Sequence, residues 1–286
     1  MNHTKLKQFA GRVIEDTARG KPTRLPNLTG ESKHWRKYFY KFSQFQRRLI
    51  AGELTAHDRA SIFALNGNKK LPFLSFSSLP IFDCPGRGEC EKFCYSLKGW
   101  RNVHPFFRQL RNTLLVRHSW REIEREWGRV LRLPRFRRLP AIAFRLYVDG
   151  DFDSVETVEK WMGLLRKSPI IEAYGYSKSW EVLLSYGGEW PKNYTLNLSS
   201  GSRYAPESGI ARAIKSLPPV RGQFLAVGKK GALAYNSPEY RAEAKRKASD
   251  MGLKRVFVCP GECGSCTPQG HFCGSNNEAP VVILTH

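Results

Sequence analysis

The sequence lacks long apolar runs. Nowhere in its 286 residues do 18 apolar residues follow one another, which excludes a membrane-spanning helix by length. The opening segment, MNHTKLKQFAGRV, has no apolar stretch of the kind found in a secretory signal peptide. We therefore expect a cytoplasmic protein with no membrane partner.

Acidic residues are also scarce. The chain has 25 Asp and Glu against 47 Lys and Arg, a net charge of +22. Because like charges repel in a compact chain, such an excess is typical of proteins that bind a polyanion. Apolar residues make up 41% of the chain and aromatic residues 12%, enough for a sizeable core, so a disordered chain is excluded.

The positive charge is concentrated in two blocks. Residues 1–70 hold 15 Lys and Arg and 5 Asp and Glu, and residues 101–138 hold 11 Arg and 3 Glu, which together account for +18 of the +22. A solubility coat would be spread more evenly. We therefore predict that the two blocks bind nucleic acid, DNA in preference to RNA.

In the first block, aromatic and basic residues alternate, as in proteins that stack bases and hold phosphates. The alternative is a helix whose aromatic residues Trp35, Phe39, Phe42 and Phe45 form core, with the cations on its other face. The predicted contacts of this block are Arg36, Lys37, Lys41, Arg47 and Arg48.

In the second block, arginines recur at helical spacing and form one stripe, suited to bidentate phosphate contacts. A merely solvated helix face is the alternative. The predicted contacts are Arg108 and Arg111, the stripe Arg121, Arg125, Arg129 and Arg132, and the following Arg135, Arg137 and Arg138. Glu122 and Glu126 lie off the stripe and do not fully neutralise it.

From residue 71 short apolar runs alternate with helical patterns, which indicates parallel β/α units. We predict a partial (β/α)6-type barrel or open sheet, because about six units are too few for a full eight-fold barrel. The division expected is a basic, mainly helical extension over 1–70, the β/α part over 71–258 and a cysteine-rich segment over 259–286. Strands are predicted at 71–77, 142–148, 171–176, 194–199, 224–227, 255–259 and 281–285, and helices at 105–132, 154–167, 206–216 and 238–251.

A loop with three cysteines follows the first predicted strand. It reads CPGRGECEKFC from Cys84 to Cys94, with Cys90 between them. In a reducing compartment cysteines serve more often as ligands or nucleophiles than in disulfides. Three thiolates on one loop suit a [4Fe–4S] cluster whose fourth iron stays open for a substrate or cofactor. Zinc, which usually shows paired C-x2-C spacing, and plain burial are the alternatives.

The order of strand, cysteine loop and β/α units resembles the radical S-adenosylmethionine enzymes, whose loop is typically C-x3-C-x2-C. The spacing here is C-x5-C-x3-C, with Phe93 at the aromatic position before the last cysteine. The segments CPGRGECEKFCYS, YVDGDFDSVETVEKW and AYGYSKSW look more like the gene product 88 family of phages and plasmids, over roughly residues 71–285. That resemblance implies a mobile-element origin and iron–sulfur chemistry, without specifying a reaction.

The same resemblance implies where a cofactor would bind. In radical S-adenosylmethionine enzymes a Gly-Gly-Glu turn after the second strand holds the amino group of S-adenosylmethionine. The matching position here reads Asp149-Gly150-Asp151, so Asp149 or Asp151 would accept that amine, and Gly150 and the Phe93 of the cysteine loop would complete the cofactor site. An ordinary βα loop with a helix cap is the alternative.

A second cysteine group lies near the C-terminus, where Cys259, Cys263, Cys266 and Cys273 form C-x3-C-x2-C-x6-C. The first three match the radical S-adenosylmethionine spacing, but only 13 residues follow Cys273, too few for a barrel. Four cysteines suffice for a closed site with [4Fe–4S] or zinc. Alternatively, one of these four cysteines would supply the fourth ligand of the first cluster. The seven cysteines are therefore expected to form one or two metal sites.

Two functions remain in competition. The first is an iron–sulfur protein of a phage or plasmid that binds nucleic acid in replication or regulation. The second is a radical S-adenosylmethionine enzyme that modifies a nucleic acid or a protein. The two charged blocks favour the first, because an enzyme acting on a small substrate does not need them.

Overall fold

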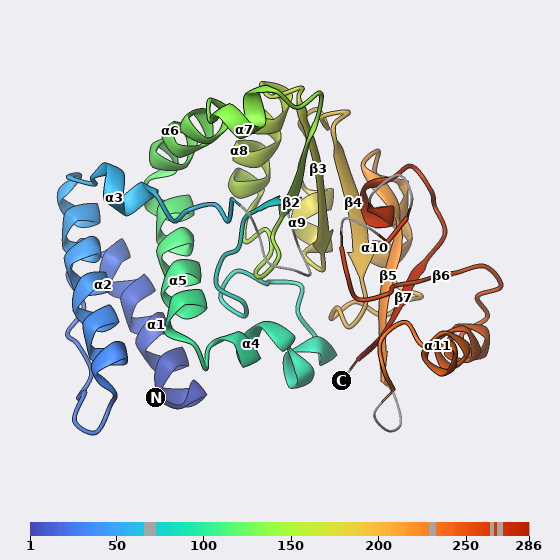
Figure 1. The fold of residues 1–286 in the computed structure, drawn as a ribbon, viewed down its shortest axis with the longest axis horizontal. Coiled ribbons are helices and arrows are strands. Elements are labelled where there is room, and N and C mark those ends of the chain that lie inside the picture. Colours follow the sequence, from blue (N-terminus) through green and yellow to red (C-terminus); the bar gives the residue numbers. More distant parts are fainter. Residues whose placement is uncertain (66–72, 229–232, 264–265, 268–270, 286) are drawn as a thin grey trace.

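A curved sheet of seven strands, each paired in parallel with its neighbours, forms the centre of the computed structural model (Figure 1). The structure describes residues 1–65, 73–228, 233–263, 266–267 and 271–285. The strands lie in the order β1-β2-β3-β4-β5-β7-β6. They are β1 (Leu74–Ser75), β2 (Ile142–Leu146), β3 (Ile171–Ser177), β4 (Tyr194–Ser199), β5 (Val220–Gly228), β6 (Phe257–Val258) and β7 (Val281–Thr285).

The sheet confirms the prediction of an α/β half-barrel with parallel strands. All seven predicted strands are present, although β1 and β6 are shorter than expected and β5 begins earlier. Residues 71 and 72 of the first prediction, and the expected link around Gly67, lie outside the described residues.

Helices between the strands cover the outer face of the sheet. They are α8 (Val155–Arg166), α9 (Trp180–Leu184), α10 (Gly209–Ala213) with the 3-10 turn η2 (Ile214–Ser216), and α11 (Pro238–Asp250). Ser154 caps α8 through the Thr157 N–H, and Ser237 caps α11 ahead of a proline, as the sequence predicts. Buried residues of α8, such as Trp161, pack against Phe144 and Phe76 on this face.

The helix predicted over 105–132 is in fact two helices. The chain forms α5 (Val103–His118) and α6 (Trp120–Leu131), separated at Ser119, whose φ of −154° is not helical. The break lets α6 turn and bury Ile123, Trp127 and Val130. A single straight helix would have carried all these arginines along one axis. Because of the break, Arg108 and Arg111 lie on α5 and the arginine stripe lies on a separate helix, α6.

Three N-terminal helices pack beside α5 and share the core of the sheet. They are α1 (His3–Ala18), α2 (Lys33–Ala51) and α3 (Ala56–Arg59). Phe39 of α2 meets Phe9 of α1 and Phe107 of α5 at ring-centroid distances of 4.9 and 5.0 Å. Trp35, Phe39, Phe42 and Phe45 are all buried, so the core interpretation of these aromatics is confirmed.

The remaining helical elements are short. They are the 3-10 turn η1 (Glu89–Phe93), α4 (Tyr95–Gly99), α7 (Pro134–Arg137) and the 3-10 turn η3 (Phe272–Gly274). None of the helices in the described ranges combines the length and apolar character needed to cross a lipid bilayer.

One buried carboxylate joins α2 to α3. Asp58 closes a capping box with Thr55 and accepts two hydrogen bonds from Arg48, at 2.9 Å from Nε and 2.6 Å from Nη2. Burial alone would raise the pKa of Asp58, but the hydrogen bonds from Arg48 and Thr55 outweigh it and lower the pKa to about 2.

This carboxylate predicts a pH-dependent stability. The folded pKa lies below the unfolded value of about 3.9, so Asp58 stabilises the fold above pH 4 and loses that contribution as the pH falls towards 2. Asp58→Asn should lower the free energy of unfolding by about 2 kcal/mol at pH 7. Urea unfolding at pH 7, 5 and 3 should show the difference from wild type shrinking, whereas the exposed Asp250→Asn should differ little at any pH. A difference that stays constant with pH would contradict the assignment.

Candidate metal centre and nucleic-acid interface

The first cysteine loop crosses the carboxyl ends of the strands. The backbone N–H groups of Gly88 and Cys90 both donate to the Gly201 carbonyl just after β4, at 3.2 Å. A Cβ on Gly86 would lie 1.6 Å from the Lys178 carbonyl just after β3, so only glycine fits there. Functional groups in parallel β/α folds gather at this edge, and the sequence places the loop there.

The three thiols of this loop are half-buried. Burial raises the pKa of the Cys84 thiol well above its usual range, and the nearby carboxylates of Asp151 and Asp83 raise it further. The Cβ of Cys90 packs against Gly201. Within the described residues, no three His, Cys, Asp or Glu side chains are positioned to hold a metal ion, so the metal sites remain a prediction.

The turn after β2 is held by donors from this chain. Asp149 accepts hydrogen bonds from Ser96 Oγ at 2.5 Å and Gln109 Nε2 at 3.0 Å. Gly150 has a φ of +80°, and a Cβ there would collide with Ser78. These contacts tie the turn to α4 and α5, and the side chain of Phe93 lies outside the described part of the structure.

Asp151, the other predicted amine acceptor, is buried. It accepts from Ser177 Oγ at 2.7 Å, from the Lys178 N–H at 2.7 Å and from the Phe152 N–H at 2.8 Å. Burial raises its pKa, although these hydrogen bonds favour the charged form. Both oxygens thus have partners within the chain, and these hydrogen bonds join the turn after β2 to the end of β3.

The second cysteine segment covers the inner face of the sheet. Alternation along β3 places Tyr174 and Tyr176 opposite Ile171 and Ala173, and Tyr174 packs with Phe272 and Cys273 of η3. Asn197 of β4 donates to the Cys273 carbonyl at 2.8 Å. The η3 part of the segment is therefore packed against the sheet.

The thiols of this segment lie within electrostatic range of one another. Burial raises the pKa of Cys259 to about 12 and that of Cys273 to about 11. The other three thiols of the segment add to the rise at Cys259. The Phe272 N–H donates to Cys266 Sγ at 3.2 Å, an arrangement that favours a thiolate.

Two cations accompany these thiols on the inner face. Arg145 of β2 lies 4.7 Å from the Tyr176 ring, and its pKa is raised despite burial by the tyrosines around it and by Cys263. Arg221 of β5 is 6% exposed and faces Cys273. In the described part of the chain neither guanidinium has a carboxylate within 4 Å. The buried atoms Arg145 Nε, Arg221 Nη2 and Tyr174 Oη lack hydrogen-bond partners there.

His271 is placed by packing. Its ring stacks on Tyr174 at 4.6 Å and lies 5.5 Å from Phe73, and burial lowers its pKa.

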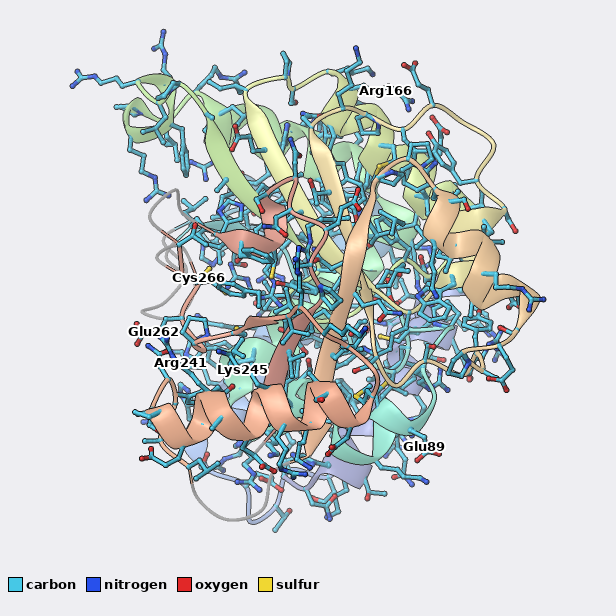
Figure 2. The ribbon with its side chains drawn as sticks, turned by 90° about the vertical axis from the view of Figure 1, so that its right-hand side faces the viewer. Glu89, Arg166, Arg241, Lys245, Glu262 and Cys266 are labelled. Carbon is cyan, nitrogen blue, oxygen red and sulfur yellow. The ribbon has the colours of Figure 1, made fainter. Side chains whose placement is uncertain are left out.

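A small cavity of about 440 Å³ lies at the outer edge of the segment, lined by Cys266, Glu262 and Arg241 among others (Figure 2). Cys266 is thus reachable from the surface.

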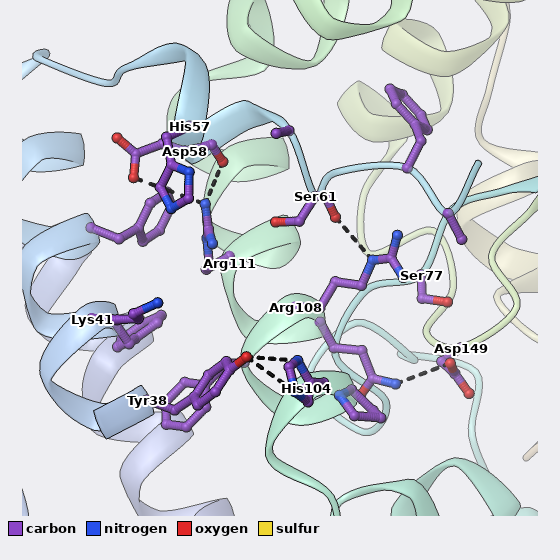
Figure 3. Close-up of a pocket in the computed structure, with 18 of the residues that line it drawn as sticks. Tyr38, Lys41, His57, Asp58, Ser61, Ser77, His104, Arg108, Arg111 and Asp149 are labelled. Carbon is purple, nitrogen blue, oxygen red and sulfur yellow. Dashed lines mark hydrogen bonds and ion pairs between the residues drawn. The ribbon is translucent and has the colours of Figure 1, made fainter. Parts of the chain in front are cut away.

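Basic residues from both charged blocks meet in one cavity of about 860 Å³ between α2, α3, α5 and the ends of β1 and β2 (Figure 3). The sequence-predicted contacts Lys41, Arg48, Arg108 and Arg111 all line it. Arg36, Lys37 and Arg47 are exposed on α2 outside the lining. The structure therefore brings together four of the predicted contacts and leaves three on the open surface.

The arginine stripe is partly neutralised. Arg125 and Arg129 form ion pairs with Glu122 and Glu126 of the same helix, and both carboxylates are buried. Arg135 stacks on Phe136. Arg121, Arg132, Arg137 and Arg138 are exposed and, among the described residues, have no carboxylate within 4 Å.

Arginines paired with a buried glutamate and arginines without a nearby carboxylate should respond differently to substitution. Arg129→Gln leaves the Glu126 carboxylate buried without its cation and should cost about 1–3 kcal/mol of unfolding free energy. Arg121→Gln removes no partner and should cost less than about 0.5 kcal/mol. Thermal or urea unfolding of both variants checks this. Equal costs would mean that the Arg129–Glu126 pair contributes nothing to stability.

Comparison with known proteins identifies the family. Residues 43–222 match the family described as gene product 88, which is more than half of the chain. No curated protein and no solved structure matches this sequence.

Proposed function

The chain belongs to the gene product 88 family, and because that name states no activity, we propose a function from the site itself: an iron–sulfur protein that binds nucleic acid. The observation that supports the metal most directly is a set of half-buried and buried cysteines beside two buried guanidiniums that, among the described residues, have no carboxylate within 4 Å. A mobile-element origin is what the family resemblance implies, and the role in replication or regulation is proposed from the two basic blocks.

The inner face of the sheet fits a thiolate-bound metal by charge. A cluster held by four thiolates is negative overall, and burying a cation without a partner is costly. Cys259, Cys263, Cys266 and Cys273 would hold the group, and Arg145 and Arg221 would neutralise it. The thiols would have to draw together on binding, since they are not yet positioned around one point. A [4Fe–4S] cluster would supply electron transfer, and zinc would supply stability alone.

The first loop is proposed as a second ligand set, formed by Cys84, Cys90 and Cys94. It lies where parallel β/α folds place their chemistry, which is the observation that favours the alternative of a radical S-adenosylmethionine enzyme. Against that alternative, Asp151 is buried and already accepts three hydrogen bonds from the chain, which leaves about one of its four acceptor sites for an amine.

Metal content tests the first half of the proposal. Protein purified without oxygen should contain iron and labile sulfide, about four of each per [4Fe–4S] cluster, and absorb visible light. Cys263→Ser should remove the iron bound by the C-terminal cysteines and leave the iron bound by the first loop. Cys90→Ser should remove the iron of the first loop and leave that of the C-terminal cysteines. Colourless wild-type protein containing only zinc would contradict the iron–sulfur assignment.

The same variants separate the two layouts. If Cys263→Ser removes all the iron while circular dichroism still reports a folded chain, the seven cysteines serve a single site. Arg145→Gln is the matched probe of the charge argument, because it keeps every thiol and should still lower cluster retention.

Nucleic-acid binding tests the second half. Each neutralised phosphate releases counterions, so log affinity for duplex DNA should fall with log salt by about 0.9 per contact. Replacing Arg121, Arg132, Arg137 and Arg138 by Gln should weaken binding and flatten that slope by up to about 3.6 units. These four are suited to the test because no buried carboxylate depends on them.

The control removes the same net charge elsewhere. Arg212, Lys215, Lys245 and Lys254 are exposed, and their replacement by Gln should leave the slope nearly unchanged. If both quadruple variants bind like wild type, the surface of α6 and α7 is only solvated. Failure of the wild type to bind duplex DNA, single strands and RNA at low salt would end the nucleic-acid proposal.

A further inference from the structure

The cavity between α2, α3, α5 and the ends of β1 and β2 has the size and walls of a ligand site. Its volume of about 860 Å³ lies within the range of about 300–1,000 Å³ typical of small-molecule sites. Figure 3 shows Arg108 and Arg111 reaching into it from α5, with Lys41 on α2 and Asp149 at the end of β2. Its position at the carboxyl ends of β1 and β2 is the usual place for a ligand in a parallel sheet.

The cavity carries an excess of positive charge. Its walls contribute the cations Lys41, Arg48, Arg108 and Arg111 and the carboxylates Asp58 and Asp149. Arg48 occupies both oxygens of Asp58, and Arg111 reaches the same carboxylate only at 3.9 Å. In the described ranges Lys41 and Arg108 have no carboxylate within 4 Å, although Asp149 acts on Arg108 at longer range, so the walls carry two positive charges in excess.

The central guanidinium, Arg108, is held in position but not neutralised. Its Nε donates to the Ser61 carbonyl at 2.9 Å, which fixes the plane of the group between Ser61 and Ser77 (Figure 3). Burial lowers the pKa of Arg108, which reports the cost of removing this cation from water. An anion with several oxygens, bound beside it, would offset that cost through charge-assisted hydrogen bonds.

The opposite wall is aromatic. Tyr38 stacks with Phe107 at 6.0 Å and an interplanar angle of 25°, and its hydroxyl lies 2.8 Å from His104 Nδ1. Tyr38 is only half-buried and so leaves ring surface available, with Lys41 Nζ 6.0 Å from its centroid. Such a wall suits a flat heterocycle, because nucleobases stack on aromatic rings.

We propose that this cavity binds a nucleoside phosphate, with the phosphate beside Lys41 and Arg108 and the base against Tyr38. The inference rests on the proposed binding of nucleic acid and adds the chemical unit that the cavity accepts. A free mononucleotide and one nucleotide of a single strand share this chemistry. S-adenosylmethionine, which carries two cationic groups and one carboxylate, matches the excess of positive charge poorly.

Calorimetric titration of the full-length protein tests the proposal, with AMP, dTMP, adenosine, inorganic phosphate, a short single-stranded oligonucleotide and S-adenosylmethionine as the probes. Mononucleotides should bind more tightly than phosphate or adenosine alone. An oligonucleotide that binds more tightly than the mononucleotide identifies a nucleic-acid strand as the source, and the reverse identifies a free nucleotide. Tighter binding of S-adenosylmethionine than of any nucleotide would overturn the proposal.

Variants locate the site. Arg108→Gln and Lys41→Gln should each weaken AMP binding about tenfold, because each removes a charged hydrogen-bond donor. Tyr38→Ala should weaken AMP binding while leaving the affinity for phosphate unchanged. The matched controls Arg101→Gln and Lys33→Gln are exposed, lie outside the cavity and should bind like wild type. Arg108→Lys keeps the charge and should recover part of the loss.

The outcomes separate this inference from the proposed function. If mononucleotides fail to bind, or if all three cavity variants bind AMP like wild type with unchanged melting curves, the cavity is not the site. Duplex binding through α6 and α7 would then be judged separately, from the dependence of duplex affinity on salt concentration. Loss of duplex binding together with retained AMP binding would contradict the proposed function and leave the cavity intact.

Discussion

Parallel pairing of all neighbouring strands is the constraint on which the rest of this molecule depends. It places the carboxyl ends of β1 to β4 at one edge, where the loop from Cys84 to Cys94 can cross from β1 to the ends of β3 and β4. The same edge supplies Ser77 and Asp149 to the wall of the large cavity. In an antiparallel sheet these groups would be divided between two edges.

The two faces of the sheet meet different requirements. The outer face is apolar and is covered by helices such as α8, as expected for β/α units. The inner face carries Arg145, Tyr174 and Arg221, and a cysteine-rich segment covers it. Polar atoms without partners in such a place are unusual in a folded protein, and each calls for an explanation. The proposed thiolate-bound cluster would provide one, since it is a negative group that would lie beside both cations.

Most of the fold could be predicted from local patterns, because strands and capped helices leave signatures in short windows of sequence. The spacing of Trp35, Phe39 and Phe42 was enough to predict a buried helix face. The break at Ser119 was missed, since helical periodicity continues on both sides of it. A lone arginine inside an apolar strand, Arg145, was the available signal for a polar inner face, but which segment covers that face depends on tertiary packing.

Charge was harder to interpret than hydrophobicity, because the pairing of charges also depends on tertiary packing. Counting charges located both basic blocks, yet the pairing of Arg125 and Arg129 with buried glutamates depends on which side of α6 faces the core. The cavity depends on the packing of α2 against α5, which brings Lys41 and Arg108 together across 67 positions of sequence. No short window contains that information.

The cavity and the first cysteine loop are also joined. Asp149 lines the cavity and accepts a hydrogen bond from Ser96, two residues beyond Cys94. Any movement of α4 that follows ligand binding by Cys94 must therefore act on a wall of the cavity, because the carboxylate is held from both α4 and α5.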